Sequence, residues 1–304
     1  MTPASPNAGL EVHRLLVPLD GTPVAELTIP AALRLASAAG AELVLVRVVA
    51  APERSTEARD YLQAIATDLA SNAVAVSLAV RRGEPAEEIL AEGRQRGVDL
   101  VLMATHARSG SDRWVGGSVA ETVLKRSPVP VLLVRATPEP SGAVLLDEHP
   151  LLLVPLDGST FSESAVSVAR GLVDLVGGEL VLLQAVTEWD QMVVANVPIR
   201  PAMDSLDAAR QHALTYLASV ADRLVAEWGG ARPRLVVGEG RPAEAIAAAA
   251  ADEGASLVVM ATHGQTALVR DLPGSNAAAT LRETTVPLLL VRPVIGVSTG
   301  RCAV

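Results

Sequence analysis

LLVPLDGTPVAE occupies residues 15–26, and a near copy, LLVPLDGSTFSE, occupies residues 152–163. The second stretch follows the first at an offset of 137 residues, and GAELVLVRVV from Gly40 recurs as GGELVLLQAV from Gly177 at the same offset. Repeats in the same order indicate two copies of one structural unit within the chain. The fold can therefore be derived for one copy and tested on the other.

Three further matches continue the duplication at an offset of 157 residues. They are GEPAEEIL (83–90) with GRPAEAIA (240–247), DLVLMATHA (99–107) with SLVVMATHG (256–264), and PVLLVR (130–135) with PLLLVR (287–292). The larger offset means that the second copy carries 20 extra residues, at about 188–206. We expect one domain at residues 1–137, a linker at 138–150, and a second domain at 151–304.

Within each copy, strand patterns alternate with helix patterns. Short aliphatic runs such as LLVPLD and ELVLVRVV are typical of strands buried on both faces. Residues 24–37 carry apolar side chains at helical spacing, and Pro85 and Gly97 mark the two ends of a later helix. This alternation predicts an α/β fold in which each copy is a doubly wound, five-stranded parallel sheet with helices on both faces.

Composition excludes several classes of protein. The chain of 304 residues is 50% hydrophobic but only 2% aromatic, so its core must consist of aliphatic side chains. A net charge of −9 argues against nucleic acid as a partner. Charges interrupt every long apolar stretch, which argues against a membrane span. The single cysteine, Cys302, excludes an internal disulfide, and no secretory signal is recognisable, so we expect a cytoplasmic protein.

Two loops of each copy are candidates for a binding site, because ligands of doubly wound sheets lie beyond the carboxyl ends of the strands. The first loop follows the first strand. It contains Pro18, Asp20, Gly21 and Thr22 in the first copy, and Pro155, Asp157, Gly158 and Ser159 in the second. The other loop follows the fourth strand and ends in Gly-Ser at a predicted helix start, where backbone N–H groups and the helix dipole favour an anion such as phosphate.

These motifs together resemble the universal stress protein family, and the resemblance covers nearly the whole chain twice. The ATP-binding branch of that family carries Gly, two residues, Gly, nine residues, and Gly followed by Ser or Thr. The spacing is intact in both copies here, but alanine replaces glycine at Ala104 and Ala107 in the first copy and at Ala261 in the second. Gly264 is retained.

The resemblance implies a role for each part of the site. The aspartates would meet the nucleoside, and the backbone at Val48, Val49, Ala185 and Val186 would line adenine. The loop after the fourth strand would contact ribose and phosphates, with Mg²⁺ accompanying ATP. Its residues are Met103, Ala104, His106, Ala107, Arg108, Gly117, Ser118 and Val119 in the first copy, and Met260, Ala261, His263, Gly264, Gly274, Ser275 and Asn276 in the second.

The resemblance also implies how the copies pack. The fold would be the adenine nucleotide alpha-hydrolase-like one, and the two domains would form a pseudo-dimer in which residues 129–135 meet residues 286–292. A homodimer of such chains and the identity of any protein partner stay open.

Simpler interpretations stand beside the nucleotide-binding ones. Asp20 and Asp157 could fill a turn or cap a helix, and His106 and His263 suit a structural role better than a catalytic one, because no nucleophile and spaced acid accompany them. Gly-x-x-x-x-Gly-Lys and dinucleotide motifs are absent. Together with the resemblance, the motifs predict a stress-response protein that binds ATP at the carboxyl ends of the strands in one or both domains and signals by occupancy, with at most slow hydrolysis. The alternatives are a nucleotide-free interaction module and, last, a ligase-type enzyme.

Overall fold

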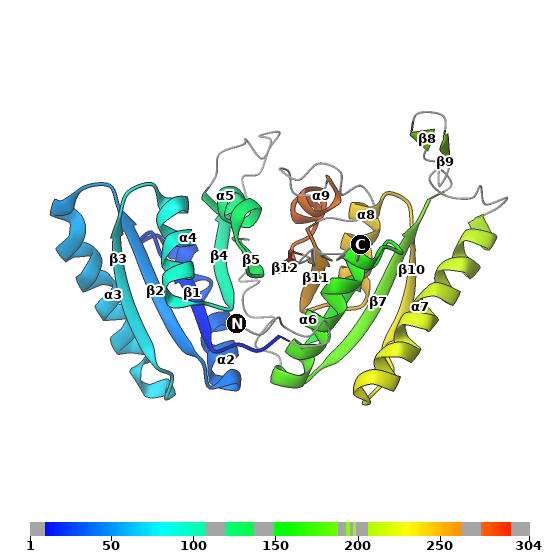
Figure 1. Cartoon of the computed structure of the whole chain (residues 1–304), viewed down its shortest axis with the longest axis horizontal. Helices are drawn as coiled ribbons and strands as arrows, with labels where there is room; N and C mark the ends of the chain where they lie inside the picture. Colours follow the sequence, from blue (N-terminus) through cyan, green and yellow to red (C-terminus); the bar gives the residue numbers. More distant parts are fainter. Residues whose placement is uncertain are drawn as a thin grey trace, which may run out of the picture.

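The computed structural model describes residues 10–106, 119–136, 149–187, 193–194, 197–198, 206–262 and 275–292. In these residues the two copies form two α/β halves, whose strands join into one ten-stranded sheet (Figure 1). The first half contains β1 (Arg14–Pro18), β2 (Glu42–Val49), β3 (Val76–Arg82), β4 (Leu100–His106) and β5 (Val131–Ala136). The second contains β6 (Leu151–Pro155), β7 (Glu179–Val186), β10 (Arg234–Glu239), β11 (Leu257–Ala261) and β12 (Leu288–Val291).

Helices connect the strands as the alternation predicts. The first half has α1 (Pro23–Glu26), α2 (Ile29–Ala39), α3 (Ser55–Leu69), α4 (Pro85–Arg96) and α5 (Val119–Arg126), with 3₁₀ turns η1 (Pro52–Arg54) and η2 (Ala70–Asn72). The second half has α6 (Thr160–Val176), α7 (Leu206–Trp228), α8 (Pro242–Asp252) and α9 (Ser275–Glu283). A separate hairpin pairs β8 (Val193–Val194) with β9 (Val197–Pro198).

The strand order is the same in both halves, β3-β2-β1-β4-β5 and β10-β7-β6-β11-β12, and all pairs within a half are parallel. The helices cover both faces of the sheet. Leu35 of α2 and Leu62 of α3 belong to the core on one face, whereas Ile89 of α4 and Leu124 of α5 belong to the core on the other. The predicted doubly wound α/β architecture is therefore confirmed.

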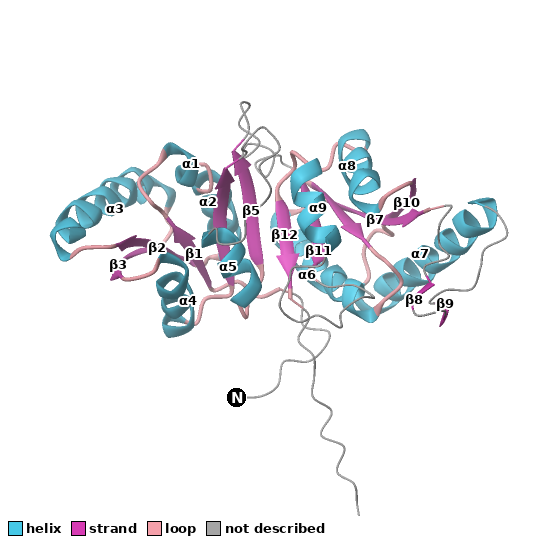
Figure 2. Cartoon of the chain, turned by 90° about the horizontal axis from the view of Figure 1, so that it is seen from above, coloured by secondary structure: helices cyan, strands magenta, loops and turns pink. Residues whose placement is uncertain are grey.

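The two halves meet strand to strand. β12 pairs with β5 in the antiparallel sense, with Leu288 opposite Leu133 and Leu290 opposite Val131. Figure 2 shows these two strands side by side in the middle of the sheet, pointing in opposite directions. The predicted contact between residues 129–135 and 286–292 is confirmed, and neither strand is left as an exposed edge.

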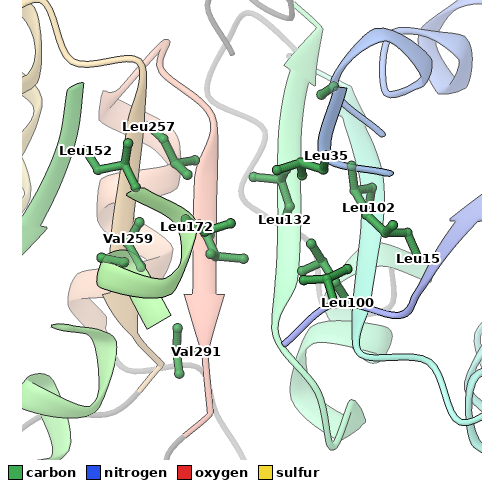
Figure 3. Packing of buried hydrophobic residues seen from close by; sticks show 14 of the residues in the cluster. Leu15, Leu35, Leu100, Leu102, Leu132, Leu152, Leu172, Leu257, Val259 and Val291 are labelled. Atoms are coloured by element: carbon green, nitrogen blue, oxygen red, sulfur yellow. The ribbon is translucent and has the colours of Figure 1, made fainter. Parts of the chain in front are cut away.

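Leucines from both halves fill the junction on the face that carries α2 and α6 (Figure 3). Leu132 of β5 and Leu289 of β12 are 1% and 0% exposed. A cavity of about 10 Å³ remains between them, lined by Leu35, Leu100, Leu132, Pro150, Leu152, Leu172, Val176, Leu257 and Leu289. This volume is about that of one water-sized sphere inside a wholly apolar lining, which favours a dry cavity. The two halves thus share one continuous hydrophobic core.

The first connecting helix differs between the copies. Residues 24–37 predict a single helix, but the structure divides it into α1 and α2, whereas α6 in the second half is continuous. Pro30 explains the break, because proline has no N–H with which to bond the carbonyl of Glu26. Ser167 occupies the corresponding place in α6 and has that N–H. Thr28 instead donates its hydroxyl to the Ala25 carbonyl at 2.7 Å, which closes the turn.

The 20 extra residues of the second copy are only partly described. They include the hairpin of β8 and β9 and the beginning of α7, which has 23 residues where α3 has 15. The extra residues therefore begin where the sequence predicts, near 188. They also extend beyond 206, because α7 itself is longer than α3.

One ion-pair network has been rearranged between the halves. In the first half, Arg96 of α4 donates to Ser77 at 3.3 Å and lies 4.0 Å from Glu42. In the second half the positive charge lies on the strand. Arg234 stands where the first half has Ser77, and Glu253 stands where it has Arg96. Arg234 and Glu253 form an ion pair at 2.7 Å. Both arrangements tie the first residues of the outermost strand to the end of the helix that follows it.

Candidate functional site

The change of chain direction in each half lies between its first and fourth strands. β1 lies between β2 and β4, and β6 lies between β7 and β11. The chain leaves β1 toward the face that carries α2, and it leaves β4 toward the face that carries α5. In sheets of this kind, ligands bind in a crevice at the carboxyl ends of these two strands, and we call that place in each half its crevice.

The loop after the first strand is built in the same way in both halves. Oδ1 of Asp20 accepts a bond from the Thr22 N–H at 2.9 Å and another from the Thr22 hydroxyl at 2.6 Å. Oδ1 of Asp157 accepts the same two bonds from Ser159, at 3.0 and 2.6 Å. The turn role that the sequence allowed for both aspartates is confirmed, and their contact with a nucleoside stays a prediction.

Thr22 and Ser159 also begin the next helix. The Thr22 hydroxyl accepts a bond from the Ala25 N–H at 3.3 Å, and the Ser159 hydroxyl accepts one from Ser162 at 3.1 Å. Gly21 and Gly158 have φ values of +89° and +82°, which L side chains rarely adopt. The Asp-Gly-Thr and Asp-Gly-Ser turns are thus rigid, and each fixes a carboxylate at the carboxyl end of a central strand.

A second layer of side chains beneath the turn was missed by the sequence analysis. The Arg47 guanidinium of β2 lies over the ring of Tyr61, 4.7 Å from the ring centre, and a Cβ on Gly21 would stand 2.9 Å from its Nη2. The Tyr61 hydroxyl donates to Glu26 at 2.8 Å. Burial, followed by this bond, raises the pKa of Tyr61 above its ordinary value.

The second half repeats the tyrosine contact but not the arginine. Tyr216 of α7 donates to Glu163 at 3.0 Å, and burial, together with the Glu163 charge, raises its pKa in the same direction. Gln184 replaces Arg47; its side chain is buried, and its Oε1 has no hydrogen-bond partner among the described residues. An alignment of YLQAI (61–65) with YLASV (216–220) would have revealed the tyrosine pair.

The predicted adenine-lining residues lie at the ends of β2 and β7. Val49 and Val186 are buried, and Val48 and Ala185 are half-buried. The Val49 carbonyl accepts a bond from Gly83 at 3.3 Å, and the Val186 carbonyl accepts one from Gly240 at 2.9 Å. Pro18 and Pro155 end β1 and β6, both half-buried. These residues do stand at the carboxyl edge where the prediction needs them.

The loop after the fourth strand is described only at its two ends. Met103 and Met260 are buried in the core beneath it, Ala104 is half-buried, and Ala261 is buried. Val119 begins α5 half-buried, and Asn276 is exposed in the first turn of α9, which begins at Ser275. Ala107, Arg108, Gly117, Ser118, His263, Gly264 and Gly274 lie outside the described residues, as do the side chains of His106 and Ser275.

The residues that the structure describes contain no group of three or more His, Cys, Asp or Glu side chains placed to hold a metal ion. No described helix combines the length and the apolar character needed to cross a membrane.

The fold defines a tandem α/β protein in which each half carries the same Asp turn at the carboxyl edge of its sheet, and the comparisons with known proteins agree. The family model described as "Universal stress protein family" matches residues 11–135 and 151–292. The chain therefore belongs to the universal stress protein family.

Individual relatives show how far the likeness extends. Universal stress protein Rv2005c of Mycobacterium tuberculosis is 32% identical over 200 residues, which is 64% of this chain and 62% of the relative's length. A universal stress protein of Thermus aquaticus is 30% identical over 46% of this chain and 97% of its own length. The structure of a universal stress protein from Archaeoglobus fulgidus superposes with a TM-score of 0.69 at 19% identity, over 93% of this chain and 97% of that one.

Proposed function

We propose that the protein binds ATP, with Mg²⁺, in the crevice of one or both halves, and that its occupancy is the signal. The observation that carries the proposal is the duplicated Asp turn beside the fourth strand, which is followed in both copies by the nine-residue spacing before Gly-Ser. A cytoplasmic location would supply the nucleotide. A protein partner that reads the occupied state is part of this proposal.

The described part of the crevice fits an adenine nucleotide in its donors and acceptors. Oδ1 of Asp20 and Oδ1 of Asp157 accept the turn bonds, which place both carboxylates at the carboxyl edge of the sheet. In the second half, the buried Oε1 of Gln184 has no hydrogen-bond partner in the part of the chain that the structure describes, and such an acceptor is stabilised by a donor such as an exocyclic amine. The helices α5 and α9 run back toward the amino edge, so their N-termini lie on the crevice side and favour phosphate.

The residues in place suit binding better than turnover. The chain's own groups would orient the nucleoside through the aspartate turns and hold phosphate oxygens through backbone N–H groups. Mg²⁺ would arrive with ATP, bound to phosphate oxygens and water, and would neutralise phosphate charge. Phosphoryl transfer needs a group that positions the attacking nucleophile, and the sequence offers none. We therefore expect hydrolysis to be slow.

The test is to denature freshly purified protein and to measure released nucleotide per chain by chromatography, followed by titration calorimetry of the emptied protein with ATP and Mg²⁺. We expect one or two equivalents. G117D should remove binding in the first half and G274D in the second, through clash and charge repulsion. ATP at about a hundredfold above its Kd should stabilise the fold by about 2.7 kcal/mol and raise Tm by several degrees.

The opposite outcome has a defined meaning. No released nucleotide and no heat on titration would exclude ATP binding and favour the nucleotide-free interaction module, for which the alanines at 104, 107 and 261 are the supporting feature. Binding that survives both G117D and G274D would show that the nucleotide lies elsewhere.

A further inference from the structure

Two arginines cross the junction between the halves and contact helix ends on the other side. Nη1 of Arg135 in β5 donates to the carbonyl oxygens of Arg282 and Thr284, at 2.8 and 3.0 Å. Nη1 of Arg292, which follows β12, donates to the carbonyl oxygen of Lys125 at 2.7 Å. Each arginine therefore holds the last turn of the other half's helix, α9 in one case and α5 in the other.

The two contacts are copies of each other. Arg135 and Arg292 are related by the repeat offset of 157 residues, and so are Lys125 and Arg282, whose carbonyls accept the bonds. The same hydrogen bond is thus made twice, once in each direction across the antiparallel pair of β5 and β12. Because both copies make this contact, it belongs to the repeated design of the junction and is not a feature of one copy alone.

The position of each arginine links it to the crevice of its own half. Arg135 pairs with Thr105 near the end of β4, and Arg292 directly follows Val291, which pairs with Ala261 at the end of β11. The helices that they hold begin at Val119 and Ser275, both predicted site residues of the opposite half. Each arginine therefore lies at the crevice of its own half and is hydrogen-bonded to the end of the helix that begins at the crevice of the other half.

A cation at a helix C-terminus acts on the whole of a short helix. The last carbonyl groups of a helix have no partners within it, and a cation there also favours the helix dipole. α5 has only eight residues and α9 nine, and helices of this length are marginal without tertiary contacts. Loss of the arginine should therefore loosen the helix as far as its first turn.

We propose that Arg135 and Arg292 are positioning residues that couple the two crevices, so that a nucleotide in one half raises the affinity of the other. This inference rests on the proposed function. A ligand that orders the end of β4 or β11 also orders the neighbouring arginine. The helix of the other half is then partly ordered already, so less free energy is needed to order it when its own ligand binds. The coupling is reciprocal by thermodynamic linkage.

The test uses the full chain and single-site backgrounds. In G117D, where only the second crevice is left, R135A should weaken ATP binding by about fivefold or more in calorimetry, and R292A, which removes the contact to the helix of the disabled half, should weaken it less. In G274D the two effects should exchange. Hydrogen exchange without nucleotide should be faster in residues 275–283 of R135A and in residues 119–126 of R292A. R232A is the matched control, because Arg232 pairs with the exposed Asp222 beside the outermost strand, β10.

The outcomes separate this inference from the proposed function. Arginine variants that weaken both crevices alike, or neither, would show a merely structural role and overturn the coupling. If the unaltered chain takes up no ATP, the proposed function fails, and hydrogen exchange alone tests the coupling. Faster exchange in α9 of R135A and in α5 of R292A would support the coupling, and unchanged exchange in these helices would overturn it. If R135A does not fold, R135Q, which keeps an amide donor, takes its place.

Discussion

Gly21 shows how one residue without a side chain shapes the turn that holds Asp20. Its φ of +89° is strained for other residues, and a Cβ there would stand 2.9 Å from Nη2 of Arg47. G21A should therefore lower the free energy of unfolding by about 1–3 kcal/mol. G40A is the matched control, since Gly40 has a φ of +62° but nothing within 4 Å of a new Cβ. Urea unfolding that gives equal losses for both variants would contradict a contribution from Arg47.

The only two tyrosines of the chain make the same bond to a glutamate, and both have raised pKa values. The sign follows from linkage: the unfolded tyrosines ionise first, so stability is complete below their ordinary pKa of about 10 and is lost as the pH rises above it. Unfolding experiments on either side of pH 10 should show this loss.

The double variant Y61F/Y216F provides the control for that pH effect. Its stability should fall by about 0.5–1.5 kcal/mol for each hydroxyl removed at neutral pH, and its decline above pH 10 should be shallower than that of the unaltered chain. An equally steep decline in the double variant would mean that other groups cause the loss.

Helices α2 and α6 show at the scale of elements what a single proline does. Proline at position 30 is tolerated because α2 starts there, whereas position 167 lies inside the continuous helix α6. S167P should therefore cost about 3 kcal/mol or more, and S167A should cost little. Chemical denaturation monitored by circular dichroism measures both. A small loss for S167P would mean that α6 breaks as easily as its counterpart in the first half.

The elements themselves were largely predictable from the sequence, and the reasons are local. Aliphatic runs gave the strands, and Pro85 at the start and Gly97 at the end bound α4 as expected, with Gly97 at φ +61°. The break at Pro30 was missed because helical spacing continues across it. The cluster of Arg47, Tyr61 and Glu26 was missed because it joins residues far apart in the chain, and only the fold brings them together.

At the scale of the molecule, the ten-stranded sheet and the shared core lead us to expect that the two halves unfold together. Leu289 of β12 is fully buried opposite Leu132 of β5 and lines the cavity shared by both halves. L289A should therefore cost about 2–5 kcal/mol and lower the stability of both halves, although the change lies in one. Hydrogen exchange resolved by segment measures this. L62A, inside the first half, is the control, and a loss confined to the second half in L289A would show that the halves unfold independently.

The relocated cation described above has a consequence for the gene. Duplicated sequences within one reading frame are open to gene conversion, in which one copy overwrites part of the other. A converted tract that carried arginine into position 77 without replacing Arg96 would bring two cations together beside Glu42, since Arg96 donates to Ser77 in the present protein. Like charges at such a distance repel. The shift of one charge from helix to strand would therefore make such a tract unfavourable unless position 96 changed together with position 77.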